Sequence, residues 1–182
     1  MTPLVLVLTA SAGWTISTAS SGCTFYVGDR QGDYAPVRAE CDWSIAPDTL
    51  HAIIGDLTAH KTYFSSVSVS EKVGDGRYRQ VHVASGISDR ELIVDMGSDP
   101  IPSGIRYWWK KSADQTGASG SNVEPNHNEG KWEITAGEDG GSHVVYELFY
   151  DPAGSVPGFM VRWFQTAGVE LLVTELKTKA GA

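Results

Sequence analysis

The sequence predicts an α+β protein in which a curved antiparallel sheet wraps around a long C-terminal helix, with two short helices after the first strand. Three observations predict this fold. Several segments between residues 67 and 150 alternate apolar and polar side chains and are joined by short turns, as antiparallel strands are. Residues 151–177 carry apolar side chains at helical spacing. The apolar face of that helix is rich in aromatic residues, so it needs a large apolar partner, and the sheet supplies one.

The composition predicts one globular domain. The chain has 182 residues, 41% of them hydrophobic, and a net charge of −8. This charge argues against a nucleic-acid partner, which usually meets a basic patch, and against simple attraction to anionic lipid. No apolar run approaches the 20 residues of a membrane-spanning helix, so no transmembrane segment is expected. We expect a monomer.

The first 22 residues are predicted to be a signal peptide or a disordered N-terminal segment, and residues 23–182 the folded domain. Residues 3–10 form a short apolar run, and Ala10-Ser11-Ala12 fits a small-x-small cleavage site. The run is short and Met1-Thr2 carries no basic side chain. Export to the periplasm or outside the cell is one interpretation, and a cytoplasmic protein with an ordinary apolar strand or tail is the other.

The two cysteines lie on either side of a predicted hairpin. Folding the segment between them about Gly32 places Cys23 opposite Cys41, where a disulfide is geometrically plausible. A disulfide would indicate an oxidising compartment. Two buried free thiols are an alternative, and lipid attachment at Cys23 is a less favoured one, because Ser20-Ser21-Gly22 lacks the apolar residue that usually precedes a lipidated cysteine.

The remaining segments follow in order from the same rules. Short helices are expected at 47–57 and 58–64, the first with Leu50, Ile53, Ile54 and Leu57 on its apolar side. Strands are expected at 67–73, 78–84, 90–96, 105–111, 131–136 and 142–150. Residues 112–130 are expected to form a long surface loop with a short strand near 122–124.

The C-terminal segment is predicted to be a turn followed by one long helix. Asp151-Pro152-Ala153-Gly154 forms the turn and Ser155 caps the helix, with Pro157 in its first turn. The predicted buried face consists of Val156, Met160, Trp163, Phe164, Ala167, Leu171 and Leu172.

The order of elements and several local segments resemble the START-like SRPBCC superfamily, which includes polyketide cyclase/dehydrase and lipid-transport proteins. The segments that carry the resemblance are 43–48 (WSIAPD), 53–57 with His60 and Tyr63-Phe64, 86–91 (GISDRE), 130–134 (GKWEI), 145–148 (VYEL) and 151–157 (DPAGSVP). The resemblance covers about Arg38–Lys177 and implies the helix-grip fold. It also implies a deep cavity that binds one hydrophobic small molecule or lipid, although a fold alone does not establish an activity.

Motifs of well-known enzymes and metal sites are missing from the sequence. It has no G-x-S-x-G, H-E-x-x-H, C-x-x-C or phosphate-binding loop. Asp56 and His60 are four residues apart, but a helix break is expected between them and two ligands do not make a metal site. No catalytic residue, cofactor or metal is predicted.

Arg90 is the most informative polar residue of the predicted cavity, because strand alternation points it to the same side as Leu92, Val94 and Met96. A buried arginine needs a carboxylate or a ligand anion, unless it reaches solvent or pairs with Asp89 or Glu91. The complete set of candidate ligand-binding residues is Arg90, His82, Gln80, Leu92, Val94, Trp108, Tyr146, Met160, Trp163 and Phe164.

The favoured function is therefore the binding, and transport, of a lipid-like molecule between the sheet and the C-terminal helix, with Arg90, His82 or Tyr146 orienting a polar head. A head bearing a carboxylate or phosphate would fit Arg90 best. One alternative is a polyketide cyclase- or dehydratase-like enzyme that uses His82 or a nearby carboxylate as acid or base. Another is an interaction module with a filled core.

Overall fold

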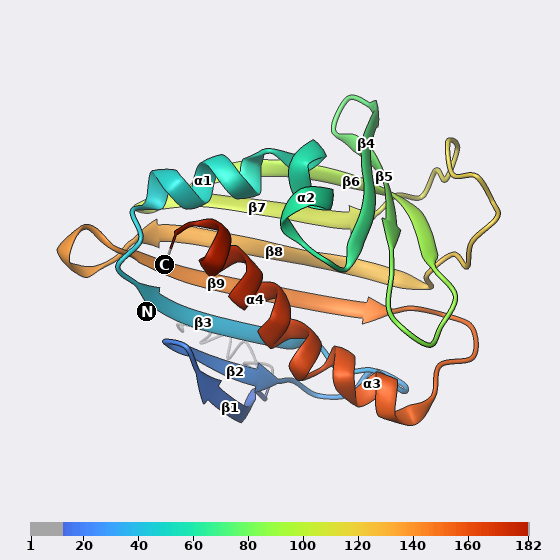
Figure 1. The fold of residues 1–182 in the computed structure, drawn as a ribbon, viewed down its shortest axis with the longest axis horizontal. Helices are drawn as coiled ribbons and strands as arrows, with labels where there is room; N and C mark the ends of the chain where they lie inside the picture. Colours follow the sequence, from blue (N-terminus) through green and yellow to red (C-terminus); the bar gives the residue numbers. More distant parts are fainter. Residues whose placement is uncertain (1–12, 182) are drawn as a thin grey trace, which may run out of the picture.

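Nine strands form a single antiparallel sheet in the computed structural model, which describes residues 13–181. The sheet curves around the C-terminal helices, which cross its concave face (Figure 1). In sheet order the strands are β1 (Thr15–Ser20), β2 (Cys23–Val27), β3 (Val37–Trp43), β9 (Ser142–Asp151), β8 (His127–Ala136), β7 (Gly104–Lys111), β6 (Arg90–Ile101), β5 (Arg77–His82) and β4 (Val67–Gly74). The predicted α+β fold class is confirmed.

Two short helical segments follow β3, as predicted. They are α1 (Pro47–Gly55), then a 3₁₀ turn, η1 (Leu57–Ala59), that leads directly into α2 (His60–Tyr63). Pro47 lies in the first turn of α1, where its missing N–H costs little. Asp56 separates α1 from η1, and its carboxylate accepts the Ala59 amide at 3.2 Å. This hydrogen bond caps the N-terminus of η1.

The hydrophobic core fills one end of the space between the sheet and the helices. Leu50, Ile53 and Ile54 of α1 are buried there, as their spacing predicts. They pack with the inward-facing residues of β2, β3, β8 and β9 and with the buried side of the last helix. The completely buried members are Ala39, Leu50, Ile134 and Leu176. The opposite end of this space, toward β5 and β6, is not filled in the same way.

The sheet begins earlier than the domain boundary proposed at residue 22. Thr15–Ser20 forms the edge strand β1, paired antiparallel to β2, although its side chains are mostly exposed. A short polar stretch has almost no apolar alternation, so the sequence gives little sign of this strand. Residues 1–12, which include the apolar run and the small-x-small site, lie outside the described residues, and the signal peptide stays a prediction.

The disulfide between Cys23 and Cys41 is confirmed. The two cysteines are directly paired across β2 and β3, with their Cα atoms 4.0 Å apart and their sulfurs bonded. Both are buried within the core. The bond therefore joins two neighbouring strands whose register is already set by the hairpin between them.

The predicted long C-terminal helical segment is present over residues 158–179, but a break at Thr166 divides it. It consists of α3 (Gly158–Phe164) and α4 (Ala167–Lys179). Thr166 lies between them with φ −137° and ψ −98°, far from helical values. The first helix begins after Pro157, without a side-chain cap, so Ser155 is not its cap. Gly168 follows the break by two residues, and a Cβ there would lie 3.0 Å from the Trp163 ring.

The interruption changes which face of the last helix is buried. Val169, Val173 and Leu176 face the core, whereas Leu171 is 43% exposed. A break between two helices shifts the rotational phase of every later residue, so the predicted face is correct for Met160 in α3 and wrong for Ala167 and Leu171.

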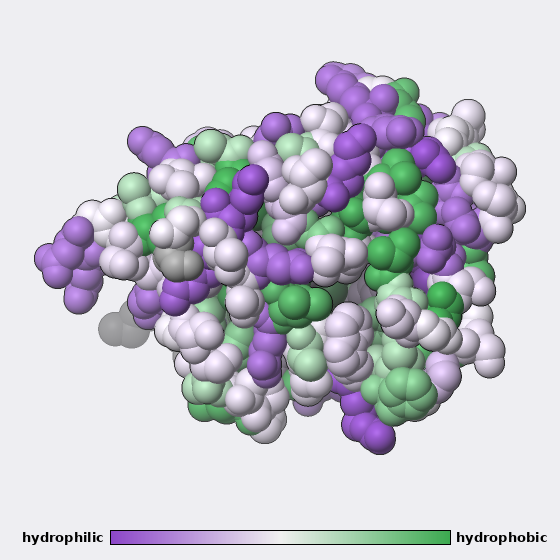
Figure 2. All heavy atoms as spheres, viewed as in Figure 1, coloured by the Kyte–Doolittle hydropathy of each residue, from purple (hydrophilic) through white to green (hydrophobic). Residues whose placement is uncertain are grey.

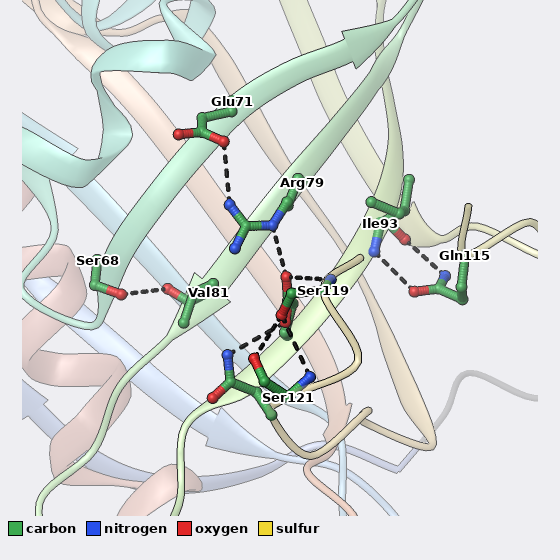
Figure 3. Close-up of polar contacts among 10 residues, drawn as sticks. Ser68, Glu71, Arg79, Val81, Ile93, Gln115, Ser119 and Ser121 are labelled. Carbon is green, nitrogen blue, oxygen red and sulfur yellow. Dashed lines mark hydrogen bonds and ion pairs between the residues drawn. The ribbon is translucent and has the colours of Figure 1, made fainter. Parts of the chain in front are cut away.

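The loop between β7 and β8 is anchored to the sheet surface opposite the cavity. Glu91 of β6 is buried, and its carboxylate accepts the Ser119 amide at 2.9 Å, the Ser119 hydroxyl, and Arg79 Nε at 2.6 Å. Figure 3 shows Arg79 between Glu71 and Ser119, and Gln115 hydrogen-bonded to the backbone of Ile93. The predicted strand near 122–124 is a single bridge between Val123 and Arg90. The loop is thus fastened to β6 at several points.

Candidate functional site: an apolar cavity under the C-terminal helices

A cavity of about 260 Å³ lies between the concave face of the sheet and the α3–α4 segment. Strands β5 to β9 supply its floor, and the residues before β4 and after β5 contribute to its rim. Figure 2 shows hydrophobic side chains gathered on the part of this face where β4 and β5 lie. Its apolar lining includes Phe64, Val67, Val83, Ile87, Trp109, Trp132, Leu148, Trp163, Phe164, Val169 and Leu172. The expected alternative of a completely filled core is therefore not what the structure has.

Most of the candidate site residues border this cavity. The seven that do are Gln80, His82, Arg90, Trp108, Tyr146, Trp163 and Phe164. Leu92 and Val94 are completely buried and Met160 is nearly so, but these three do not line the cavity. They are packed around the cavity. Strand alternation predicts that a side chain points inward, but it does not predict whether the space in front of that side chain is empty or filled.

Several lining residues were not among the sequence candidates. On β7 the candidate Trp108 borders the cavity, and so do Tyr107 and Trp109, which by the register with β8 lie on the same face of the sheet as Trp132. Three consecutive aromatic residues show no alternation, so the pattern could not select the inward pair. Leu148 and Tyr150 of β9 were missed as well, although they share the strand parity of Tyr146. The alternation along β9 could therefore have identified both residues from the sequence.

Gly130 makes room for one of these aromatic rings. A Cβ at Gly130 would lie 2.3 Å from Trp109 Cζ2 and 2.3 Å from the Glu147 carbonyl oxygen. The carbonyl oxygen belongs to the backbone and cannot move aside, so a side chain does not fit at this position. The ring of Trp109 can lie over β8 because Gly130 has no side chain. The ring then stacks against Tyr146 with their centroids 6.0 Å apart, and Tyr146 also packs on Trp132 at 4.4 Å.

Arg90 is buried at the edge of the cavity and is bound by backbone. Its Nε donates to the Pro152 carbonyl at 3.0 Å, its Nη2 to the Ala153 carbonyl at 3.0 Å, and its Nη1 to the Ser88 carbonyl. The guanidinium thus holds the turn before α3 against the start of β6. The sequence offered a carboxylate, a ligand anion or solvent as its partner. Within residues 13–181 it forms no ion pair, and carbonyl oxygens take that place.

A chain of hydrogen bonds leads from the wall of the cavity to His82. The Ser70 hydroxyl donates to the Leu57 carbonyl at 2.7 Å, and Gln80 Nε2 donates to that hydroxyl at 3.4 Å. The amide oxygen of Gln80 consequently faces His82 Nε2, 3.1 Å away. Burial lowers the pKa of His82 to about 4, so the imidazole is neutral at pH 7. The cyclase-like enzyme that would use this histidine stays a prediction.

Two tyrosine hydroxyls belong to the polar part of the lining. Tyr146 and Tyr150 project from β9 on the cavity side, and Tyr150 packs against the ring of His82 with centroids 5.8 Å apart. Neither hydroxyl has a hydrogen-bond partner among the described residues. Burial raises the pKa of both phenols, so both remain protonated donors.

Other kinds of site are not assembled in the described part of the chain. Between residues 13 and 181, no three histidine, cysteine, aspartate or glutamate side chains come together as metal ligands would. His60 is buried, and its Nε2 lies 3.0 Å from the Ile54 carbonyl instead of pairing with Asp56. None of the helices in this range has the length and apolarity needed to span a bilayer.

Comparison with solved structures gives the fold. A STAR-related lipid transfer protein from Xanthomonas axonopodis is similar over 91% of this chain and 99% of its own, with 19% identity and a TM-score of 0.75. Human STARD10 is similar over 94% of this chain and 74% of its own, with 14% identity and a TM-score of 0.78. A START superfamily protein from Mycobacterium smegmatis is similar over 80% of this chain and 96% of its own, with 14% identity and a TM-score of 0.61.

Neither a protein-family model nor a curated protein sequence matches this chain. The likeness is therefore one of structure at low identity, and it extends over most of the chain. The sheet order, the short helices after β3 and the C-terminal helices over the concave face all agree with it. The chain has the START-like, helix-grip fold.

Proposed function

We propose that this protein binds, and transfers, a hydrophobic small molecule of lipid-like character in the cavity between the sheet and the α3–α4 segment. The observation that carries the proposal is the cavity itself: about 260 Å³, with walls mostly of aromatic and aliphatic side chains and few polar groups. Such a composition is typical of small-molecule sites. The volume suits a compact ring system or a single acyl chain better than a lipid with two long chains.

The START-like fold supports the same proposal. The Xanthomonas axonopodis protein with this fold is named as a STAR-related lipid transfer protein. At 19% identity that likeness concerns the fold, so the ligand of this chain must be argued from its own cavity. Burial of apolar ligand surface would provide most of the affinity, at roughly 25 cal/mol for each Å² removed from water.

The first test is native mass spectrometry of protein purified from its own host, followed by organic extraction. We expect a lipid-like mass that is released only on denaturation. The direct test uses purified protein and the uncharged dye N-phenyl-1-naphthylamine, whose fluorescence rises in apolar surroundings. Wild-type protein that neither carries a lipid-like mass nor binds the dye would refute the proposal.

Adjacent residues of α4 provide a matched pair of variants for the dye experiment. Leu172 lines the cavity, whereas Leu171 is 43% exposed on the outer side of the same helix. Leu172→Trp would fill part of the cavity and should weaken dye binding about tenfold or more, a loss of ~1.4 kcal/mol. Leu171→Trp should bind as the wild type does. Equal affinities of the two variants would place the dye site elsewhere.

A further inference from the structure

We propose that the cavity selects a neutral, hydroxyl-bearing ligand over an anionic one, with the hydroxyl bound between His82 and Tyr150. This inference rests on the proposed function and specifies the class of ligand. It also reverses the expectation, drawn from sequence, that a carboxylate or phosphate would be preferred at Arg90. Three features of the described residues lead to it: the bonding of Arg90, the tautomer of His82 and the unpaired tyrosine hydroxyls.

The first feature is that the only charged side chain among the described lining residues is already engaged. Each of the three nitrogens of the Arg90 guanidinium donates to a backbone carbonyl of Ser88, Pro152 or Ala153. The guanidinium has five N–H groups, so two remain, but its charge is already surrounded by three carbonyl oxygens that also hold the turn before α3. A ligand carboxylate would have to compete with these carbonyl oxygens for the charge of Arg90, and an anion left without a direct cationic partner in this apolar space costs several kcal/mol.

The second feature is that the hydrogen-bond chain determines which nitrogen of His82 carries the proton. Ser70 donates to the Leu57 carbonyl and so accepts from the Gln80 amide nitrogen. The Gln80 oxygen then faces His82 Nε2 as an acceptor, which requires Nε2 to be the N–H donor. Nδ1 is left as a lone pair with no partner among the described residues. The lone pair of Nδ1 can accept a hydrogen bond from a ligand hydroxyl, and it repels the negative charge of a carboxylate.

The third feature is the donor beside this acceptor. The Tyr150 ring packs on the His82 ring with centroids 5.8 Å apart, and its hydroxyl has no partner among the described residues. An alcohol both donates and accepts hydrogen bonds. Its oxygen can accept a hydrogen bond from the Tyr150 hydroxyl while its O–H group donates one to His82 Nδ1. A carboxylate can use only the tyrosine. The pair therefore matches a neutral alcohol, and the apolar walls match its hydrocarbon part.

The experiment compares three ligands with the same hydrocarbon chain: 1-dodecanol, dodecanoate and dodecane. Each displaces N-phenyl-1-naphthylamine from the full-length protein at pH 8, where the acid is ionised. We expect dodecanol to bind about tenfold or more tightly than dodecanoate. Dodecane, which has no head group, should bind more weakly than dodecanol by the contribution of the two hydrogen bonds, about 10- to 100-fold.

Two near-isosteric variants identify the head-group site. Tyr150→Phe removes one hydroxyl, and His82→Phe replaces the imidazole with a ring that cannot accept a proton. Each should lower the affinity for dodecanol about 3- to 10-fold and leave the affinity for dodecane unchanged. Unchanged dodecane binding also shows that the variant is folded and its cavity intact. Tyr63→Phe, at a tyrosine outside the lining residues, is the control and should change neither affinity.

The outcomes separate the two proposals. Dodecanoate binding as tightly as dodecanol, or more tightly, would overturn the neutral-ligand inference while leaving hydrophobic binding established. Selective dodecanol binding that neither variant weakens would overturn the assignment to His82 and Tyr150. If none of the three compounds displaces the dye and the dye itself does not bind, the proposed function fails and this inference fails with it.

Discussion

At the scale of single residues, the molecule places its buried charges on the two faces of β6. Arg90 points toward the cavity and is surrounded by carbonyl oxygens, whereas Glu91 points to the opposite face and binds Arg79 and Ser119. Strand alternation explains why neighbours in sequence face opposite sides. Both residues hold a loop against the strand, so β6 organises the turn before α3 on one side and the β7–β8 loop on the other.

Glu91 should make the stability of the protein depend on pH in the acid range. Burial would raise the pKa of Glu91, but the hydrogen bonds from Ser119 and Arg79 outweigh it and lower the pKa from 4.5 to about 2. Because the folded pKa is depressed, this stabilisation is complete above about pH 4.5 and is lost as the pH falls toward 2. We expect Glu91→Gln to lower the free energy of unfolding by roughly 1–3 kcal/mol at pH 7.

Urea denaturation between pH 7 and pH 2.5 checks this expectation. The wild type should lose more stability across the range than Glu91→Gln does. Glu71→Gln removes the exposed carboxylate that shares Arg79, and we expect a cost below about 1 kcal/mol. Parallel curves for wild type and Glu91→Gln would show that this carboxylate does not control the acid response.

At the scale of elements, the break between α3 and α4 is the main departure from the predicted arrangement. It divides the C-terminal segment into a short helix that carries Trp163 and Phe164 to the cavity and a longer one that closes the core. A continuous helix would place Leu171 inward and turn Leu176 away. With its observed rotation about the helix axis, α4 packs on the hydrophobic core at one end of the space under the helices and lines the cavity at the other end.

Alanine substitutions should report this phase directly. Leu176 is completely buried, and Leu176→Ala should lower the free energy of unfolding by roughly 2–5 kcal/mol. Leu171→Ala removes the same atoms from a position that is 43% exposed, and we expect a change within about 0.5 kcal/mol. Chemical denaturation of the two variants checks both values. A larger cost at Leu171 would support a single uninterrupted helix.

At the scale of the whole molecule, the disulfide acts mainly on the unfolded chain. Cys23 and Cys41 are 18 residues apart, and closing a loop of this size restricts the unfolded ensemble by about 3 kcal/mol. A Cys23→Ser, Cys41→Ser double variant should lose about that much stability without changing fold. Denaturation of the wild type with a reductant should give the same value as the variant. A reductant that leaves the wild type unaffected would show that the thiols are not joined.

The disulfide is also the structural feature that bears on location in the cell. A bonded pair indicates an oxidising compartment and is consistent with export. The signal peptide expected at the N-terminus falls on residues 1–12 for its apolar run, outside the described residues, so it stays a prediction. Peptide mapping without reductant on protein from its own host would test the bond in its native compartment.

The sequence by itself determined the features that depend on neighbours along the chain. Alternating segments and short turns predict the antiparallel strands, the spacing of Leu50, Ile53 and Ile54 predicts α1, and the hairpin geometry predicts the bond between Cys23 and Cys41. Each of these follows from local periodicity or turn chemistry, and packing reinforces such preferences instead of opposing them. For this reason the fold class and the location of the cavity were predictable.

Only the tertiary structure decided the features that depend on distant segments. The placement of Tyr107 and Trp109 on the face of Trp132 depends on the register of β7 with β8 and on the space that Gly130 leaves. Arg90 finds its partners about 60 residues later, in the turn at Pro152 and Ala153. The break at Thr166 has Gly168 nearby, but a lone glycine within a helical pattern does not by itself place a break. Non-local contacts, which no local pattern encodes, decide these details of the site.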